Sequence, residues 1–180
     1  MKKIVILLAV AVFAGCNSPS KDATSTSAAS DSGRTDALNY AYTPDYSSKF
    51  GIGDSKNAQT ILTLWKTWDE GNLSAGKDLF ADSVTMHFAD GSMLHGTRDS
   101  ILSAGQKIRD NFGKVESKVH AWVALKSTDK NENWVSIWGT EVHADKKGKT
   151  DSTELQETWR LNNDGKADLV YQYARQSPKK

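Results

Sequence analysis

TELQETWRL, at residues 153–161, is a short stretch in which every second residue shares a face. Regular alternation of this kind predicts a half-buried β-strand. One face carries Leu155, Glu157, Trp159 and Leu161, so a carboxylate lies mid-strand among apolar side chains. A charge removed from water is costly unless it is paired or protonated. The stretch therefore predicts either a polar group at the bottom of an apolar pocket or a strand whose twist brings Glu157 to water.

The segments around this stretch predict further strands. Residues 115–126 alternate apolar and polar side chains, and residues 134–143 are apolar on both phases, as in a central strand covered on both sides. The turn sequence Asn-Asn-Asp-Gly at 162–165 leads into a last strand at 169–174. Together with 153–161, these segments predict a four-stranded antiparallel meander.

Helices precede the meander. Apolar residues recur at helical spacing over residues 55–71 and again over 97–113, and a short helix is expected at 74–80. Asp90 and Gly91 form a strong hairpin signal between two short strands. This order predicts an α+β domain, in which N-terminal helices pack over a curved antiparallel sheet.

The start of the chain has the composition of a targeting signal. Residues 1–15 contain Lys2 and Lys3, an apolar run too short to span a bilayer, and two small residues before Cys16. The sequence Val-Phe-Ala-Gly-Cys resembles the lipobox of bacterial lipoproteins, whose cysteine carries the lipid; a plain secretory signal is the alternative. Cys16 is the only cysteine, so an internal disulfide and a thiolate metal cluster are excluded.

Two segments separate this signal from the domain at 57–176. Residues 16–38 are rich in Ser, Thr, Ala and Asp, which predicts a flexible tether. Residues 39–56 are rich in aromatic side chains, and we expect them to lie against the domain. We expect a protein held to the bacterial cell envelope through lipid on Cys16, facing the periplasm or the cell surface. Its 23 basic and 22 acidic residues are interspersed, which argues against a nucleic-acid partner.

Three pieces of sequence resemble the SnoaL-like division of the nuclear transport factor 2 superfamily. They are LWKTWDEGNLSAGKDLFADSVTMHF at 64–88, His95-Gly96, and ETWRLNNDGK at 157–166. The resemblance implies a sheet curled into a cone, with helices at its mouth and an interior that binds small, mostly apolar molecules. Members include ketosteroid isomerases, dehydratases, epoxide hydrolases, polyketide cyclases and proteins with a pocket but no known reaction.

Most catalytic positions of these enzymes are absent from this chain. Ketosteroid isomerases carry a tyrosine where this chain has Leu64, and an aspartate that acts as the general base where it has Phe88. Only their protonated aspartate has a counterpart here, Glu157. Dehydratases of this fold need two histidines facing the cavity. His87 and His120 share the phase of the opposite face, so we expect them to point away from the interior.

Tryptophans are the remaining signal for a ligand site. Aromatic walls with few polar groups suit a planar apolar ligand, although ordinary core filling explains them as well. The predicted ligand contacts are Trp65, Trp68, Met86, Phe88, Trp138, Trp159 and Gln172, and the candidate catalytic residue is Glu157. Glu141 and His143 share a phase and could join Glu157 as an acid–base group, or lie at a solvated strand end. No motif for a metal site or a nucleophile elbow is present, so we expect neither a metal nor a cofactor.

Three functions fit the sequence. The first is non-catalytic binding of a small apolar molecule, which the two missing isomerase positions favour. The second is an acid–base enzyme, such as an isomerase, dehydratase or hydrolase, that uses Glu157. The third is a scaffold that forms a homodimer, or pairs with another envelope protein, through an outer sheet face carrying His120, Trp122 and Trp134.

Overall fold

The structure, a computed structural model, describes residues 40–176. The predicted signal peptide, Cys16 and the tether fall outside the described residues. Residues from Thr43 onward belong to one compact unit, and the fold described below is that unit alone. Among the described residues, no helix is both long enough and apolar enough to cross a membrane.

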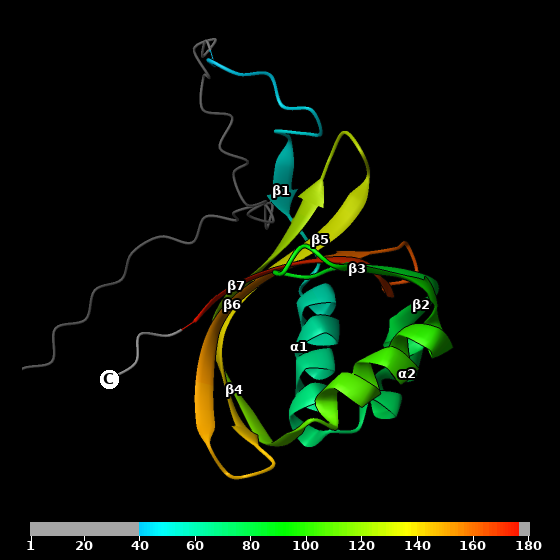
Figure 1. Cartoon of the computed structure of the whole chain (residues 1–180). Helices are drawn as coiled ribbons and strands as arrows, with labels where there is room; N and C mark the ends of the chain where they lie inside the picture. Colours follow the sequence, from blue (N-terminus) through cyan, green and yellow to red (C-terminus); the bar gives the residue numbers. More distant parts are fainter. Residues whose placement is uncertain (1–39, 177–180) are drawn as a thin grey trace, which may run out of the picture. The chain divides into compact units, whose positions relative to one another are not determined.

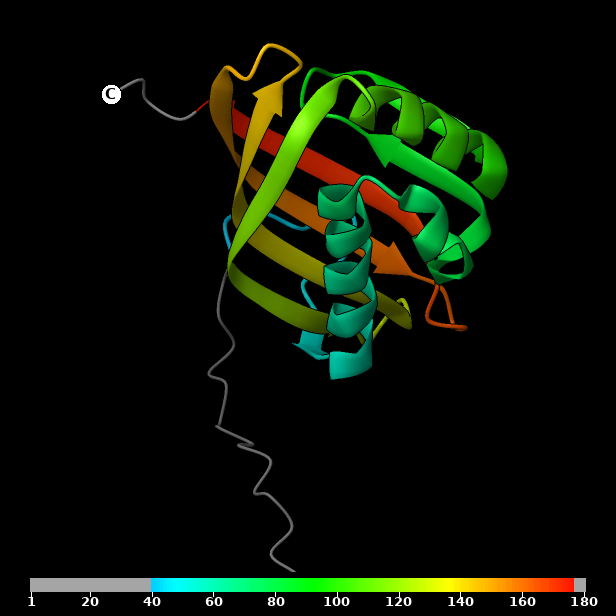
Figure 2. The ribbon, with the colours of Figure 1, turned by 90° about the horizontal axis from the view of Figure 1, so that it is seen from below.

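The compact unit contains helices on one side of a curved sheet (Figure 1). In chain order, the elements are β1 Phe50–Ile52, α1 Ser55–Glu70, the 3₁₀ helix η1 Leu73–Leu79, β2 Phe80–His87, β3 Met93–Thr97, α2 Arg98–Arg109, β4 Phe112–Ser127, β5 Glu132–Asp145, β6 Thr150–Leu161 and β7 Ala167–Gln176. Figure 2 shows α1 lying across the strands, with η1 between it and α2, which lies over β2 and β3.

The strands form one sheet in the order β1-β4-β5-β6-β7-β2-β3. Neighbouring strands are antiparallel except β2 and β7, which pair in parallel. The predicted α+β class and the antiparallel meander, β4 to β7, are confirmed. The sequence patterns missed β1, which pairs with the end of β4, and the parallel pairing that joins the hairpin to the meander.

Local capping explains where the helices begin and end. The Asp54 carboxylate accepts a hydrogen bond from the Lys56 backbone N–H at 2.9 Å, and Gly71 closes α1 with φ of 72°. The Thr97 hydroxyl caps α2 by accepting from the Ser100 N–H. Helix α2 ends at Arg109, four residues before its predicted end at Gly113, because β4 already begins at Phe112.

The sheet has an inner face under the helices and an outer face opposite. The buried inner-face side chains include Val84, Ala124, Val135, Ile137, Trp159, Leu161 and Val170, which pack with Ile61, Leu64 and Trp65 of α1. A bulge between Val119 and Ala121 reverses the alternation of β4. Trp122 then pairs with the buried Ile137 and therefore lies on the inner face, although its side chain is 54% exposed. The prediction that Trp122 points outward is wrong.

Residues 43–49 lie at the β4–β5 turn. The Tyr46 ring packs edge-on against Trp134 at 6.0 Å, and its hydroxyl donates to the Glu132 carboxylate. The Ser47 hydroxyl donates to the Asp129 carboxylate at 2.6 Å. This part of the aromatic segment lies against the domain, as the sequence predicted.

Candidate functional site

Glu157 lies on the inner face of β6, and its carboxyl accepts hydrogen bonds from three neutral donors. Oε2 accepts from the indole N–H of Trp65 at 2.7 Å and from that of Trp159 at 2.8 Å. Oε1 accepts from the amide Nε2 of Gln172 at 2.9 Å. The side chain is only 7% exposed, so these contacts replace nearly all of its hydration. The structure therefore shows Glu157 as a buried polar group and not as a side chain that the twist of the strand brings to water.

Three elements meet at this carboxyl because of their sequence pattern. Trp159 follows two residues along β6, Gln172 pairs directly with Glu157 on β7, and Trp65 reaches down from α1. Gly139 makes room for the Trp65 ring, since a Cβ there would lie 2.8 Å from its Cζ3. The absence of a side chain at one inner-face position thus lets α1 lie close enough for the indole to reach the acid.

Burial is the dominant electrostatic effect on Glu157. Desolvation raises the pKa of its carboxyl above 4.5, while the donors Gln172, Trp159 and Trp65 lower it in that order. The Glu141 carboxylate raises it further by like-charge repulsion. The protonated form is therefore favoured relative to an acid in water.

A second polar group occupies the inner face of β5. The Glu141 carboxylate accepts from the indole N–H of Trp68 at 2.7 Å, and His143 Nδ1 lies 3.3 Å from its other oxygen. That pair is close enough for an ion pair but does not form a hydrogen bond, and Nδ1 has no hydrogen-bond partner among residues 40–176. The imidazole packs against Phe112 at 4.6 Å. Side-chain exposures of 13% for Glu141 and 19% for His143 place both groups between solvent and core.

The inner face becomes accessible next to these groups. Leu155 and Ala174 pair across β6 and β7, one step from the Glu157–Gln172 pair, and Leu155 is half-buried while Ala174 is exposed. Gln172 is also half-buried, whereas Glu157 beneath the helix is buried. We call Leu155 and Ala174 the accessible stretch of the inner face; it borders Gln172 and Glu157.

The remaining predicted ligand contacts are not all at this place. Met86 lies on the inner face and packs against the core, and Phe88 is half-buried in the turn after β2. Trp138 pairs with Gln156, which lies on the outer face, and its side chain is 37% exposed. The prediction that Trp138 lines the interior is wrong: on a strand that is apolar on both phases, Ile137 and Gly139 take the inner face. His87 and His120 lie on the outer face, as predicted.

Two supporting residues were missed by the sequence patterns. Asp69 at the end of α1 accepts from both the N–H and the hydroxyl of Ser117 on β4. Buried Arg109 of α2 donates to four backbone carbonyls, those of Trp68, Asp69, Phe112 and Gly113. Both residues fix the end of α1 that carries Trp65 and Trp68, and neither has a sequence motif that would reveal it.

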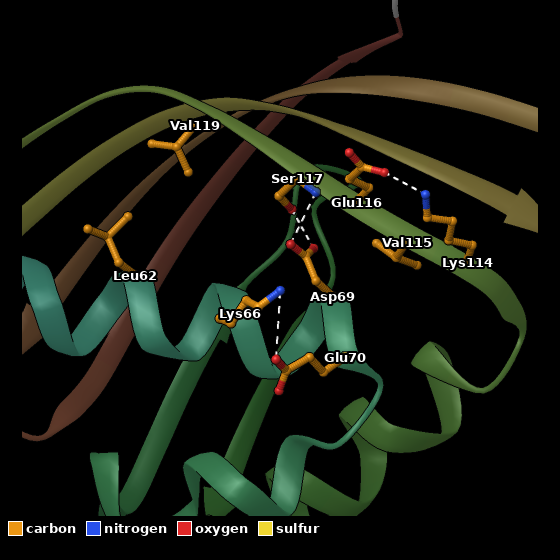
Figure 3. Close-up of a pocket in the computed structure, with 9 residues that line it drawn as sticks. All are labelled: Leu62, Lys66, Asp69, Glu70, Lys114, Val115, Glu116, Ser117 and Val119. Carbon is orange, nitrogen blue, oxygen red and sulfur yellow. Dashed lines mark hydrogen bonds and ion pairs between the residues drawn. The ribbon is translucent and has the colours of Figure 1, made fainter.

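A cleft of about 510 Å³ lies between α1 and β4 (Figure 3). It is lined by Leu62, Lys66, Asp69, Glu70, Lys114, Val115, Glu116, Ser117 and Val119. Four of its charged side chains are paired, Lys66 with Glu70 and Lys114 with Glu116, and Asp69 accepts hydrogen bonds from Ser117. Glu157 does not line this cleft. Within residues 40–176, no group of three or more His, Cys, Asp or Glu side chains could hold a metal ion.

Comparisons with known proteins agree with this geometry. No protein-family model matches the sequence, and no curated protein matches it. A solved protein of unknown function from Exiguobacterium sp. 255-15, described as nuclear transport factor 2-like, is 16% identical; the match covers 66% of this chain and 99% of that one, with a TM-score of 0.53. The fold is the nuclear transport factor 2-like fold.

Two other structures share this nuclear transport factor 2-like fold. A hypothetical protein from Catenulispora acidiphila, with a ketosteroid isomerase-like fold and in complex with trimethylamine, is 16% identical over 64% of this chain and 84% of that one, with a TM-score of 0.53. SalBIII, an epoxide hydrolase/cyclase-like enzyme in salinomycin pyran ring formation, is 12% identical over 67% and 92%, with a TM-score of 0.53.

Proposed function

We propose that this protein binds a small, mostly apolar molecule at the accessible stretch of its inner sheet face and does not transform it. The contacts assigned to the ligand are Trp68, Leu155, Ala174, Gln172 and, at the hairpin side, Met86 and Phe88. Trp65 and Trp159 are buried in the core and hold the Glu157 carboxyl in place. Apolar walls with a few fixed polar groups are the usual composition of a small-molecule site.

The observation that carries this proposal is that Glu157 already accepts three hydrogen bonds from the protein. A general base needs a lone pair directed at the substrate, and a general acid needs a proton directed at it. Here Oε2 receives two indole N–H groups and Oε1 receives the Gln172 amide. The carboxyl therefore holds the walls of the site together, and its bond to Gln172 Nε2 leaves the Gln172 carbonyl oxygen free to accept from a ligand.

Fold and targeting signal add support. Proteins of this fold include one in complex with trimethylamine and one epoxide hydrolase/cyclase-like enzyme, so the fold accommodates small molecules. The lipobox-like segment ending at Cys16 supports attachment to the cell envelope, with the binding domain beyond the 16–38 tether.

The proposal is tested by filling the accessible stretch with a larger side chain and measuring the binding of an apolar dye. Ala174→Trp places a large ring on the inner face, whereas Tyr173→Trp makes a matched change on the outer face of the same strand. Nile red, a neutral apolar dye, should fluoresce with the wild type and with Tyr173→Trp, and much less with Ala174→Trp. Equal fluorescence of both variants would contradict binding at this face.

A second function is favoured by one observation, the pairing of Glu141 with His143. A carboxylate 3.3 Å from an imidazole nitrogen places an acid and a base side by side, although without the hydrogen bond that would orient the ring. An acid–base enzyme would then use His143, and not Glu157, which already accepts three hydrogen bonds from the protein. The test incubates fresh protein with compounds extracted from the purified protein. Conversion by the wild type that is lost in His143→Gln would establish the enzyme. Unchanged compounds would support binding alone.

A further inference from the structure

A second cleft, of about 460 Å³, lies at the start of α1. The end of η1, the start of β5 and the β6–β7 turn form its other walls. Apart from Leu79, every side chain that lines it is polar. Glu157 and its three hydrogen-bond donors do not line it, so it is separate from the inner-face site. Its volume lies in the range of about 300–1,000 Å³ that is usual for small-molecule sites.

Asn57 is the buried polar side chain of this cleft. It lies in the first turn of α1 and is only 7% exposed, and polar groups buried to this extent are nearly always hydrogen-bonded. Among residues 40–176, its side-chain amide has no hydrogen-bond partner, yet it is not one of their fully enclosed unpaired groups. The amide is therefore open to the cleft. A Cβ at Gly165 would lie 3.9 Å from Asn57 Oδ1, which places this oxygen next to the β6–β7 turn.

Charged side chains of both signs line the same cleft. Lys56 is on α1, Asp78 on η1, and Asp164 and Lys166 are at the β6–β7 turn. Within the part of the chain that the structure describes, none of these four side chains forms an ion pair. In the cleft between α1 and β4, by contrast, four charged side chains are paired. The donors and acceptors around Asn57 are therefore available to a ligand.

The composition of the cleft selects among ligand classes. An apolar ligand would leave the Asn57 amide unpaired, which is unfavourable for a buried polar group. An anion would meet the carboxylates of Asp78 and Asp164. A metal ion lacks ligands, since no group of three His, Cys, Asp or Glu side chains within residues 40–176 could hold one. A hydroxyl group both donates and accepts, so carboxylates, ammonium groups and carboxamides can all bind it.

We infer that this cleft binds a sugar, a neutral molecule with several adjacent hydroxyl groups. The Asn57 amide is the central contact, because it donates to one hydroxyl through Nδ2 and accepts from a neighbouring one through Oδ1. Asp78 and Asp164 accept from further hydroxyls, and Lys56 and Lys166 donate to them. This site goes beyond the proposed function and does not depend on it.

Binding is tested on the whole protein with two kinds of probe. The methyl glycosides of glucose, galactose and mannose present adjacent hydroxyls in different arrangements, whereas cyclohexanol has a ring of the same size with a single hydroxyl. Saturation-transfer NMR should detect binding of at least one glycoside, and cyclohexanol should not displace it. No transfer to any of the glycosides at millimolar concentration would overturn the inference, and so would displacement by cyclohexanol.

Variants assign the binding to this cleft. Asn57→Leu should weaken the glycoside about tenfold in Kd, as expected for the loss of one or two hydrogen bonds. Gln59→Leu, a matched change at an exposed position of α1 that does not line the cleft, should bind as the wild type does. Asp164→Ala, at an exposed turn position, should also weaken binding and serves if Asn57→Leu does not fold.

A stability measurement separates binding from a structural role of Asn57. Because its amide has no partner among the described residues, Asn57→Leu should not lower the melting temperature, whereas loss of a structural hydrogen bond would. Equal glycoside binding by Asn57→Leu and the wild type would place the sugar elsewhere and overturn the inference. Nile red fluorescence should be the same in both proteins, so this site and the inner-face site are tested separately.

Discussion

At the residue scale, Glu157 experiences two opposing effects. Burial favours the protonated acid, while three donors favour the carboxylate, and burial is the larger effect. The unfolded chain has no such burial. A carboxyl that holds its proton more tightly in the folded state makes stability depend on pH with a definite sign.

Wild-type stability should fall, relative to Glu157→Gln, as the pH rises above 4.5. Below that pH, the Glu157 carboxyl is protonated in both the folded and the unfolded protein, so the stability of the wild type relative to Glu157→Gln does not change with pH. Above it, the unfolded carboxyl ionises first, which favours unfolding until the pH passes the raised folded pKa. Urea unfolding of both proteins at a series of pH values measures this; parallel stability curves would contradict the burial of Glu157.

Glu157→Leu should destabilise the fold at every pH. An apolar replacement of a buried acid can stabilise when the acid lacks partners. Here leucine would leave two indole N–H groups and an amide unsatisfied, a cost of about 3 kcal/mol. The free energy of unfolding checks this, and a leucine variant as stable as the wild type would mean that the three bonds contribute nothing.

At the scale of elements, Arg109 links α1, α2 and β4 through backbone carbonyls. A guanidinium at the end of α1 also neutralises the negative end of the helix dipole. Arg109→Met should cost about 3 kcal/mol, since four carbonyls lose a buried charged donor. Lys107→Met, exposed on the same helix, should change stability by less than about 0.5 kcal/mol. Similar losses in both would contradict the role of Arg109.

The strands show how far a sequence pattern predicts position. Strand β6 alternates without interruption, so the inner placement of Glu157 beside Trp159 follows from its period. In β4 the bulge at Val119–Ala121 inserts one residue, and every assignment after it, Trp122 included, changes face. No local sequence feature marks that bulge.

The prediction for strand β5 was wrong for a different reason. Both of its faces are apolar, so periodicity cannot say whether Trp138 or Gly139 points inward. The Trp65 ring over Gly139 settles the phase, and that contact joins residues far apart in the chain. The bonds from Gln172, Asp69 and Arg109 likewise depend on tertiary packing, which is why the site was predicted only in part.

At the scale of the whole molecule, the outer sheet face exposes aromatic side chains. Trp138 is 37% and Tyr173 60% exposed, and Tyr171 stacks on His87 at 4.8 Å. Exposed apolar surface of this kind is typical of an interface. These residues, and not Trp122, are the reason to propose a homodimer through this face.

Light scattering should detect a homodimer that Tyr173→Lys converts to a monomer, because a lysine would be buried against an apolar partner. Ile108→Lys, at an exposed apolar position on α2, should leave the dimer intact. A wild-type monomer at high concentration would remove the dimer and the self-pairing scaffold together.

Attachment to the envelope depends on Cys16. Cys16→Ser removes the thiol that would carry lipid, so the protein should move from the membrane fraction to the soluble fraction of a bacterial host, while Ser18→Ala should remain with the membranes. Sedimentation followed by mass spectrometry of the N-terminal peptide measures both. A lipid-bearing Cys16→Ser protein would refute the lipoprotein assignment.

The central claim is that a buried acid, held by two indoles and an amide, organises a binding site inside the sheet. Carbon-13 NMR of the Glu157 carboxyl, titrated over pH in the folded protein, tests it most directly. A pKa above 4.5 is the predicted result. A solvent-like pKa would show that Glu157 reaches water and would contradict the account.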